Sequence, residues 1–300
     1  MKKSSLYVRR ITISAAFLSI AIVLRTMFTF EVPLFGQNGM RIGIADIFSF
    51  MPAILFGPIY GMIVSGIYDI LGFIIKPTGP FIPLMTITAV CGGFIRGALW
   101  SLLGHRSSKK MRVIVITCSI LLLLVGISNI TFLSSDGIHA GFYETVPKEE
   151  INTENMHLVS KMLISRTIDT KDPSGNLATY ILFMTTGVMG SAILGIVLLF
   201  ADFFISKKFL KDTQKGQVPQ LLIVLLVSGL IVTTLNTFVL REVFSSWKLL
   251  PFSVIWIPRL IEEILSNTIY TYFMAMLLGV LRRQRGLQEL ITTPTSTKGY

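Results

Sequence analysis

The chain is built from long apolar segments separated by short polar ones. An α-helix needs about 20 apolar residues to cross the hydrocarbon layer of a bilayer, so this pattern predicts eight membrane-spanning segments, two of them short or interrupted by glycine. The predicted segments are residues 11–30, 42–56, 58–75, 81–103, 113–133, 177–205, 218–240 and 252–281. The predicted fold class is an all-α integral membrane protein, with residues 1–300 as a single membrane domain.

The positive charges lie mainly at one end of these segments. Residues 1–10, 104–112, 206–217 and 282–300 each contain four Lys or Arg, together 16 of the 27 in the chain. Positive residues are enriched in short cytoplasmic loops. We therefore predict a multi-pass protein of the cell membrane with both termini in the cytoplasm.

Composition excludes several other functions. Apolar residues make up 52% of the chain and charged residues only 14%, which is typical of a protein that has the lipid bilayer as its partner. The net charge of +11 sits at helix ends, so we expect no nucleic-acid binding. Cys91 and Cys118 both fall inside apolar segments, and no phosphate-binding loop motif occurs. We expect no metal site, no cofactor and no catalytic residue.

Polar residues inside the spans carry the best functional signal, because such residues are costly in lipid and usually face a protein interior. With a rise of about 1.5 Å per residue, six of them are predicted to lie within about 10 Å of the outer surface. They are Arg25, Asp46, Asp69, Asn236, Trp256 and Arg259, and they come from five helices.

Two interpretations of this outer cluster are open. The arginines and aspartates could pair with one another and link the helices. Alternatively they line a pocket open to the outside, in which Arg25 or Arg259 holds a ligand carboxylate and Asp69 holds an amine or a protonated ring. Nearer the inner surface, Arg96 and Asp202 are expected to have a structural role. Glu262 and Glu263 are deeper, and at least one is expected to face other helices.

Three external loops flank the predicted cluster. Residues 33–43 contain Gln37, Asn38 and Arg41, which favour a lid over a ligand, whereas residues 76–83 are equally compatible with an ordinary turn. The acidic loop 134–176 is expected to include a short surface helix and, at 172–176, a turn. A solvated cap is the favoured role for this long loop.

Small residues on the first span form a face on which another helix could approach closely. Ala15 and Ser19 are four residues apart, and Ala16 lies beside them. Span three has a similar series in Gly57, Gly61, Ser65 and Gly66. Such faces most often mediate packing within one chain, so this pattern alone names no partner.

Several short motifs follow one another in a recognisable order. They are the run Val23, Leu24, Arg25; Arg41 with Pro52; GPIYG at 57–61; SGIYDILG at 65–72; TGPF at 78–81; LNT at 235–237; and IPRLIEEIL at 257–265. In this order the sequence resembles the substrate-binding S components of energy-coupling factor (ECF) transporters, closest to the folate-type branch. The resemblance covers residues 11–103 and 218–282.

The resemblance implies a six-helix membrane protein that binds a vitamin or similar micronutrient with high affinity and does not hydrolyse ATP itself. Its partners would be a transmembrane coupling (T) protein and two cytoplasmic ABC ATPases. In this family the small-residue face of helix one docks on the coupling protein, which here implies Ala15, Ala16 and Ser19. Ligand contacts come from the first and third external loops, which adds Arg41 and Phe81 to the predicted ligand-binding residues.

Residues 104–217 depart from the family pattern. They hold two further spans and the long external loop, so they are predicted to be an inserted transmembrane hairpin. An even number of spans preserves the orientation of the last two helices. The total is therefore a six-helix core plus an inserted pair.

Three other functions compete with that of an S component. Intramembrane CAAX-type proteases combine glutamates with membrane-embedded histidines, but all three histidines here lie in loops. A stand-alone secondary transporter would show two related halves, which the sequence lacks. A purely structural membrane protein stays open as the third alternative.

Overall fold

The computed structural model describes residues 3–34, 37–77, 79–104, 106–138, 154–168, 180–209, 217–248 and 250–282. Within these residues, seven helices are long and apolar enough to cross a membrane. Six run as α1 (Lys3–Met27), α3 (Pro58–Ile75), α4 (Pro83–Leu103), α5 (Ser108–Ser135), α9 (Val218–Val243) and α11 (Phe252–Leu281). The seventh spans Tyr180–Asp202 and includes the π-helical turn η3 (Phe183–Gly187) and most of α8 (Val188–Phe209).

The predicted fold class is confirmed, because the protein is a largely α-helical bundle of apolar helices. The predicted spans 58–75 and 252–281 agree with α3 and α11 to the residue. The prediction that residues 42–56 cross the whole membrane is wrong. Their helix, α2 (Ala45–Phe56), has 12 residues, about 18 Å of helix, which is too short to cross a bilayer.

A β-hairpin replaces the predicted first external loop. Strands β1 (Thr29–Leu34) and β2 (Gln37–Gly43) pair antiparallel, with a register shift at Val32/Pro33. The prediction of span 11–30 was therefore also too long, since α1 ends at Met27. The Gly- and Pro-rich composition and polar residues predicted an irregular loop that closes over a ligand, but here two short strands pair and satisfy their backbone groups.

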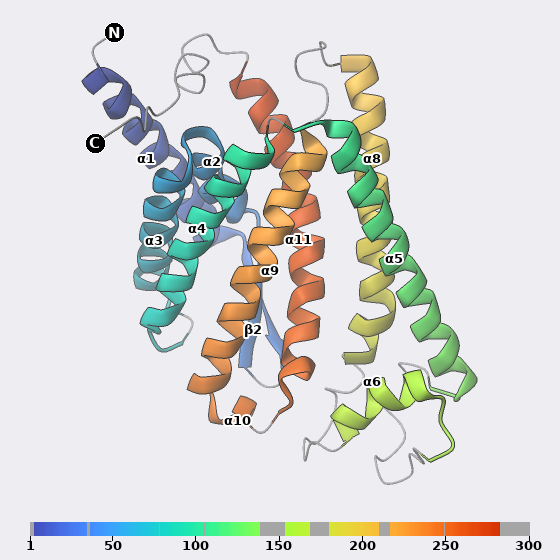
Figure 1. The fold of residues 1–300 in the computed structure, drawn as a ribbon. Helices are drawn as coiled ribbons and strands as arrows, with labels where there is room; N and C mark the ends of the chain where they lie inside the picture. Colours follow the sequence, from blue (N-terminus) through green and yellow to red (C-terminus); the bar gives the residue numbers. More distant parts are fainter. Residues whose placement is uncertain are drawn as a thin grey trace.

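The hairpin enters the helix bundle. The hydroxyl of Tyr270 donates a hydrogen bond of 2.8 Å to the carbonyl of Gly43, at the end of β2. Tyr270 lies 18 residues after the start of α11, which is about 27 Å of helix rise. The chain thus returns deep into the bundle before α2 begins (Figure 1).

Six helices form one closely packed unit: α1, α2, α3, α4, α9 and α11. Glycines allow α3 and α4 to touch, since a Cβ on Gly61 or Gly93 would overlap the backbone of the facing helix. An apolar cluster that includes Phe17, Met51 and Leu225 fills one end of this unit and extends to Leu103 and Leu281. That end of the bundle therefore has a dry, filled core.

The remaining helices lie to one side of the unit. Helices α5 and α8 pack on each other, with η3 and α8 against α11 and α5 against α9. The short helix α6 (Leu158–Ile168) lies near the lower ends of α5 and α8 (Figure 1). The predicted surface helix of the long loop is present here, while residues 139–153 and 169–179, with the predicted turn, fall outside the described residues.

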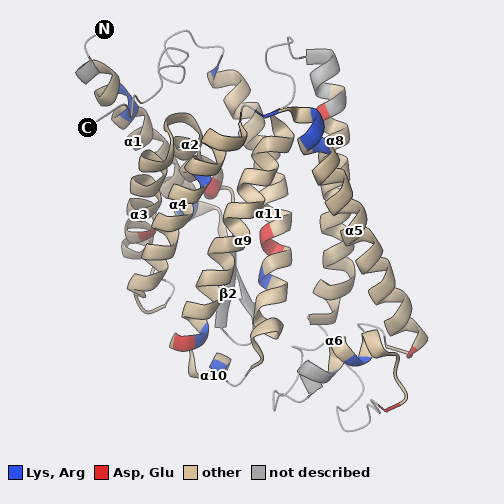
Figure 2. Cartoon of the chain, viewed as in Figure 1, with Lys and Arg blue, Asp and Glu red and all other residues tan. Residues whose placement is uncertain are grey.

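The two ends of the bundle carry different features. The ends of α1 and α11 at Lys3 and Leu281 lie at one end of the bundle, and the α3–α4 connection, α6 and the four-residue helix α10 (Ser245–Lys248) lie at the other (Figure 1). Charged residues gather mainly near these two ends (Figure 2). A few charged positions nevertheless lie in the middle of the bundle, among them several on α11.

A polar cavity within the helix bundle

A cavity of about 550 Å³ lies among the six packed helices. Its wall is formed by α1, α2, α3, α4, α9 and α11, together with residues 79–82 and Phe244. Seven charged side chains line it: Arg25, Arg96, Arg259, Asp46, Asp69, Glu262 and Glu263. Six aromatic side chains complete the wall: Phe50, Tyr68, Phe73, Phe81, Phe244 and Tyr270. This combination of charged and aromatic groups suits a small polar molecule with a flat ring.

Helical spacing explains how these side chains reach one place. On α4 the cavity is lined by Met85, Ala89, Gly92 and Arg96, which follow each other at intervals of three or four residues. On α11 the series is Arg259, Glu262, Glu263, Ser266 and Tyr270. Such intervals place residues on one face of an α-helix. Each of these two helices therefore presents one face to the cavity, and this face is polar on α11 but small or apolar on α4 except at Arg96.

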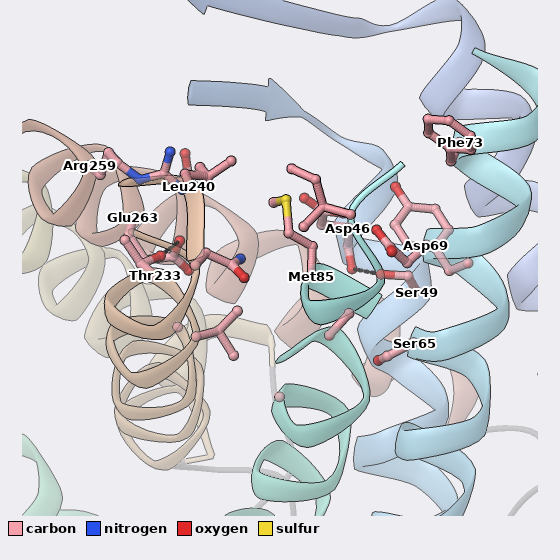
Figure 3. Close-up of a pocket in the computed structure, with 18 of the residues that line it drawn as sticks. Asp46, Ser49, Ser65, Asp69, Phe73, Met85, Thr233, Leu240, Arg259 and Glu263 are labelled. Atoms are coloured by element: carbon pink, nitrogen blue, oxygen red, sulfur yellow. Dashed lines mark hydrogen bonds between the residues drawn. The ribbon is translucent and has the colours of Figure 1, made fainter. Parts of the chain in front are cut away.

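Six of the eight predicted ligand-binding residues line the cavity. They are Arg25, Asp46, Asp69, Phe81, Asn236 and Arg259. The side chain of Arg41, like those of Gln37 and Asn38, lies outside the described part of the structure. Figure 3 shows Asp46 and Asp69 on one side, Arg259 and Glu263 on the other, and Met85 between them.

Trp256 does not line the cavity. Its indole nitrogen donates a hydrogen bond of 2.9 Å to the hydroxyl of Thr234, and its ring stacks with Phe252. Phe252 in turn stacks on Phe238 of α9. Trp256 thus belongs to the contact between α9 and α11. Its depth was the reason to group it with the cluster, but the depth of a residue does not give its direction around the helix axis.

Arg25 is held by the helix that faces it. Its guanidinium donates a hydrogen bond of 3.0 Å to the carbonyl of Tyr68 and lies over the Tyr68 ring, 4.9 Å from the centroid. A Cβ on Gly72 would overlap this guanidinium, so the glycine makes room for it. The side chain is 6% exposed. Arg25 is therefore a buried cation with a fixed position at the cavity wall.

Asp46 and Asp69, the two aspartates predicted to bind ligand, form no ion pair with the described residues. Asp69 accepts a hydrogen bond of 2.7 Å from the hydroxyl of Thr86. Among the described residues, neither Asp46 nor Asp69 has an arginine or lysine nitrogen within 4.0 Å. The interpretation of these aspartates as salt-bridge links between helices is not supported by this geometry.

The two glutamates of α11 differ in their partners. Glu263 accepts hydrogen bonds of 2.6 Å from Thr233 and 2.6 Å from Asn267. Glu262 accepts one of 2.9 Å from Ser266, one turn further along the same helix. Both glutamates line the cavity, and Glu263 also faces α9 through Thr233, which agrees with the prediction that at least one of them faces other helices.

Arg96 is the main cavity residue that the sequence did not indicate. It was expected to have a structural role near the inner surface, yet it is 5% exposed and lines the cavity. Its guanidinium carbon lies 3.4 Å from the centroid of the Phe50 ring. The spacing of small residues at Ala89 and Gly92, two turns and one turn before Arg96, was the available signal, because small side chains on that face leave room for a cavity.

Asp46 lies deeper than predicted. The prediction placed it within about 10 Å of the outer surface by counting residues along a continuous helix. The chain instead arrives through β2, whose last residue, Gly43, is hydrogen-bonded to Tyr270 well inside α11. Asp46 follows three residues later, in the first turn of α2. The cavity therefore has polar groups at more than one depth.

The small-residue face of α1 points away from the cavity. Ala15, Ala16 and Ser19 are exposed, while Ser14 and Phe17 are buried against the bundle. The hydroxyl of Ser19 is bonded to the carbonyl of Ala15, 2.9 Å away, so its donor is satisfied within the helix. This face does not pack against the described part of the chain and is open to another molecule.

A membrane-spanning bundle with a polar cavity is an arrangement suited to proteins that bind or carry small molecules. Residues 9–153, just under half of the chain, match the family model described as ECF transporter, substrate-specific component. This region is therefore similar to the substrate-specific components of ECF transporters. The match continues past residue 103 and so includes α5. No curated protein and no solved structure matched the chain.

The family that this model describes is a family of transporter components and not an enzyme family. Its members are membrane proteins that work with a transmembrane T protein and with ATPases. In the described residues, no group of three or more His, Cys, Asp or Glu could hold a metal ion.

Proposed function

We propose that this chain is the substrate-specificity subunit of an ECF-type ABC importer and binds a vitamin or similar micronutrient. The observation that carries this proposal is the charged cavity enclosed by membrane-spanning helices, in a chain whose N-terminal half matches the S-component family. A folate-like molecule is the favoured ligand, because the sequence resembles the folate-type branch most. Arginines such as Arg25 and Arg259 suit a ligand carboxylate.

The ligand is proposed to enter from the outside. The cavity wall includes residues 79–82, in the α3–α4 connection, and Phe244, next to α10. Both elements lie at the end of the bundle opposite Lys3 and Leu281 (Figure 1). The apolar cluster around Met51 and Leu225 fills the other end. Four Lys/Arg-rich segments favour a cytoplasmic location for the termini. Together these features support a binding site that loads from outside and is closed toward the cytoplasm.

Delivery into the cell is proposed to depend on partners. A transmembrane coupling protein would dock on Ala15, Ala16 and Ser19, and two cytoplasmic ABC ATPases would supply the energy. Support comes from the exposure of these three residues on a helix whose other face is buried. Reorientation of the whole subunit against the coupling protein would then carry the ligand across the membrane.

The test is to purify the chain from its own host and identify the co-purifying small molecule by mass spectrometry. We expect a vitamin at close to one molecule per chain. A preparation that contains no small molecule, and that binds none from a vitamin mixture by equilibrium dialysis, would contradict the proposal.

A further inference from the structure

A second group of charged residues in the cavity shares Asp46 with the predicted outer cluster and adds residues that the sequence did not assign to that cluster. Three of its members come from three helices: Asp46 from α2, Arg96 from α4 and Glu262 from α11. The aromatic rings of Phe50 and Tyr270 line the same cavity. A binding role for this group rests on the proposed function and bears on the chemical class of the ligand.

Arg96 is a buried cation without a polar partner. It is 5% exposed, and among the described residues its guanidinium makes neither a hydrogen bond nor an ion pair. Its guanidinium makes a cation–π contact with the face of the Phe50 ring. A buried charge without hydrogen bonds is costly, and such groups in native structures call for an explanation. Since Arg96 lines the cavity, a bound molecule can supply the missing acceptor.

Two carboxylates that line the same cavity as this cation have unused acceptor capacity. Asp46 makes no side-chain hydrogen bond or ion pair with the described residues, and Glu262 accepts only the local bond from Ser266. An ionised carboxylate can accept about four hydrogen bonds. Glu263, by contrast, is already held by Thr233 and Asn267, so it is better suited to position the site than to contact a ligand.

We infer that the cavity wall formed by Asp46, Arg96 and Glu262 is a subsite for an amino-substituted nitrogen heterocycle. Asp46 and Glu262 accept hydrogen bonds from its N–H groups, and Arg96 donates to a ring nitrogen or carbonyl oxygen on the same molecule. The flat ring lies against the aromatic side chains. A simple carboxylic acid or an aliphatic amine satisfies only one of the two kinds of group, whereas such a ring satisfies both.

The rival explanation is that these charges only stabilise the bundle. The two explanations differ in the empty protein. If Arg96 serves a ligand, replacement by methionine removes an uncompensated buried charge and should not lower the thermal midpoint of the empty protein by more than about 3 °C. If Arg96 is structural, the same replacement lowers the midpoint by more than that.

The test uses the purified full-length chain in detergent and four probes: folate, thiamine, nicotinate and pantothenate. Folate and thiamine carry an amino-substituted heterocycle, and the other two do not. We expect folate or thiamine to bind. We expect Asp46→Asn, Glu262→Gln and Arg96→Met each to weaken that binding about tenfold to a hundredfold. The matched controls are Asp202→Asn and Arg112→Met, which alter a pair of 2.6 Å outside the cavity and should leave affinity unchanged.

Four results would overturn this inference. The first three are binding of nicotinate or pantothenate alone, unchanged affinity in all three cavity variants, and a large loss of stability in the empty Arg96→Met protein. The fourth is failure of all four probes to bind. In that case the compound that co-purifies with the chain distinguishes the importer proposal from the subsite proposal. If that compound is a vitamin without an amino-substituted ring, the importer proposal stands and only the subsite proposal fails.

Discussion

The six-helix unit around the cavity and the α5–α8 pair beside it differ in how they use polar residues. Seven charged side chains line the cavity inside the six-helix unit. Between α5 and α8 the described ion pair is Arg112 with Asp202, at one end of the pair. Elsewhere α5 contacts η3 through Asn129, which donates to the carbonyl of Met184. Both regions are apolar enough to span a membrane, but in the six-helix unit the charged side chains surround a cavity, whereas the described charges between α5 and α8 pair directly with each other.

Burial differs in the same way. Helix α9 has 11 buried residues among 26, whereas α5 has five among 28. Much of α5 therefore faces lipid, while α9 faces other helices on most sides. Hydropathy alone does not separate a helix that lines a binding site from one that flanks it. Variants in the two regions, ordered by the size of their effect, can test this division of roles.

The strongest effect is expected at the exposed face of α1. The double replacement Ala15→Trp and Ser19→Trp should reduce uptake by whole cells to background, because two bulky side chains block a close helix–helix approach. Binding by the purified chain should stay within about twofold, since neither residue lines the cavity.

The matched control for this face is Ile120→Trp, on the exposed surface of α5. It should leave both uptake and binding unchanged. Equal loss of uptake in this variant would mean that the α5–α8 pair also takes part in coupling. Loss of binding together with uptake in the α1 variant would count against a docking role.

A somewhat smaller effect is expected at the cavity wall. Arg259→Ala and Asp69→Ala should each weaken binding of the compound that co-purifies with the wild-type chain by about tenfold or more, because each removes a charged contact. Isothermal titration of the ligand-free chain provides the measurement. Wild-type affinity in both variants would remove the outer cluster from the binding site.

A stability difference is expected between glycines of the two regions. Gly93→Ala should destabilise the chain by about 1–3 kcal/mol, because the new Cβ would overlap Gly61 on the facing helix α3. Gly190→Ala in α8 meets nothing within 4 Å and should be neutral or slightly stabilising. Thermal unfolding in detergent measures both variants. Equal destabilisation would show that the α5–α8 pair is packed as tightly as the cavity unit.

The weakest effect is expected for Asn129→Ala. The replacement removes the 2.9 Å bond to the carbonyl of Met184 and should cost about 0.5–1 kcal/mol, the usual size for such bonds between membrane helices. Ligand affinity, measured by the same titration, should not change. A clear loss of affinity would connect the α5–α8 pair to the cavity through η3, whose Gly187 lies against Ile261 of α11.

The sequence predicted the membrane class, most helix bounds and the family resemblance, because transfer of an apolar segment into lipid depends on that segment alone. It also predicted six of the residues that line the cavity, because charged groups in lipid must find a polar or protein-lined surface. The ligand-binding roles of these residues stay predictions.

Only the tertiary structure decided how deep and in which direction each side chain lies. The β-hairpin forms because two short strands pair and because Gly43 meets Tyr270, a residue 227 positions away. That contact places Asp46 deep in the bundle. Packing on α9 turns Trp256 away from the cavity. The small residues Ala89 and Gly92 leave Arg96 exposed to the cavity. Depth and direction depend on neighbours distant in sequence, and hydropathy, which sums local transfer energies, carries no information about them.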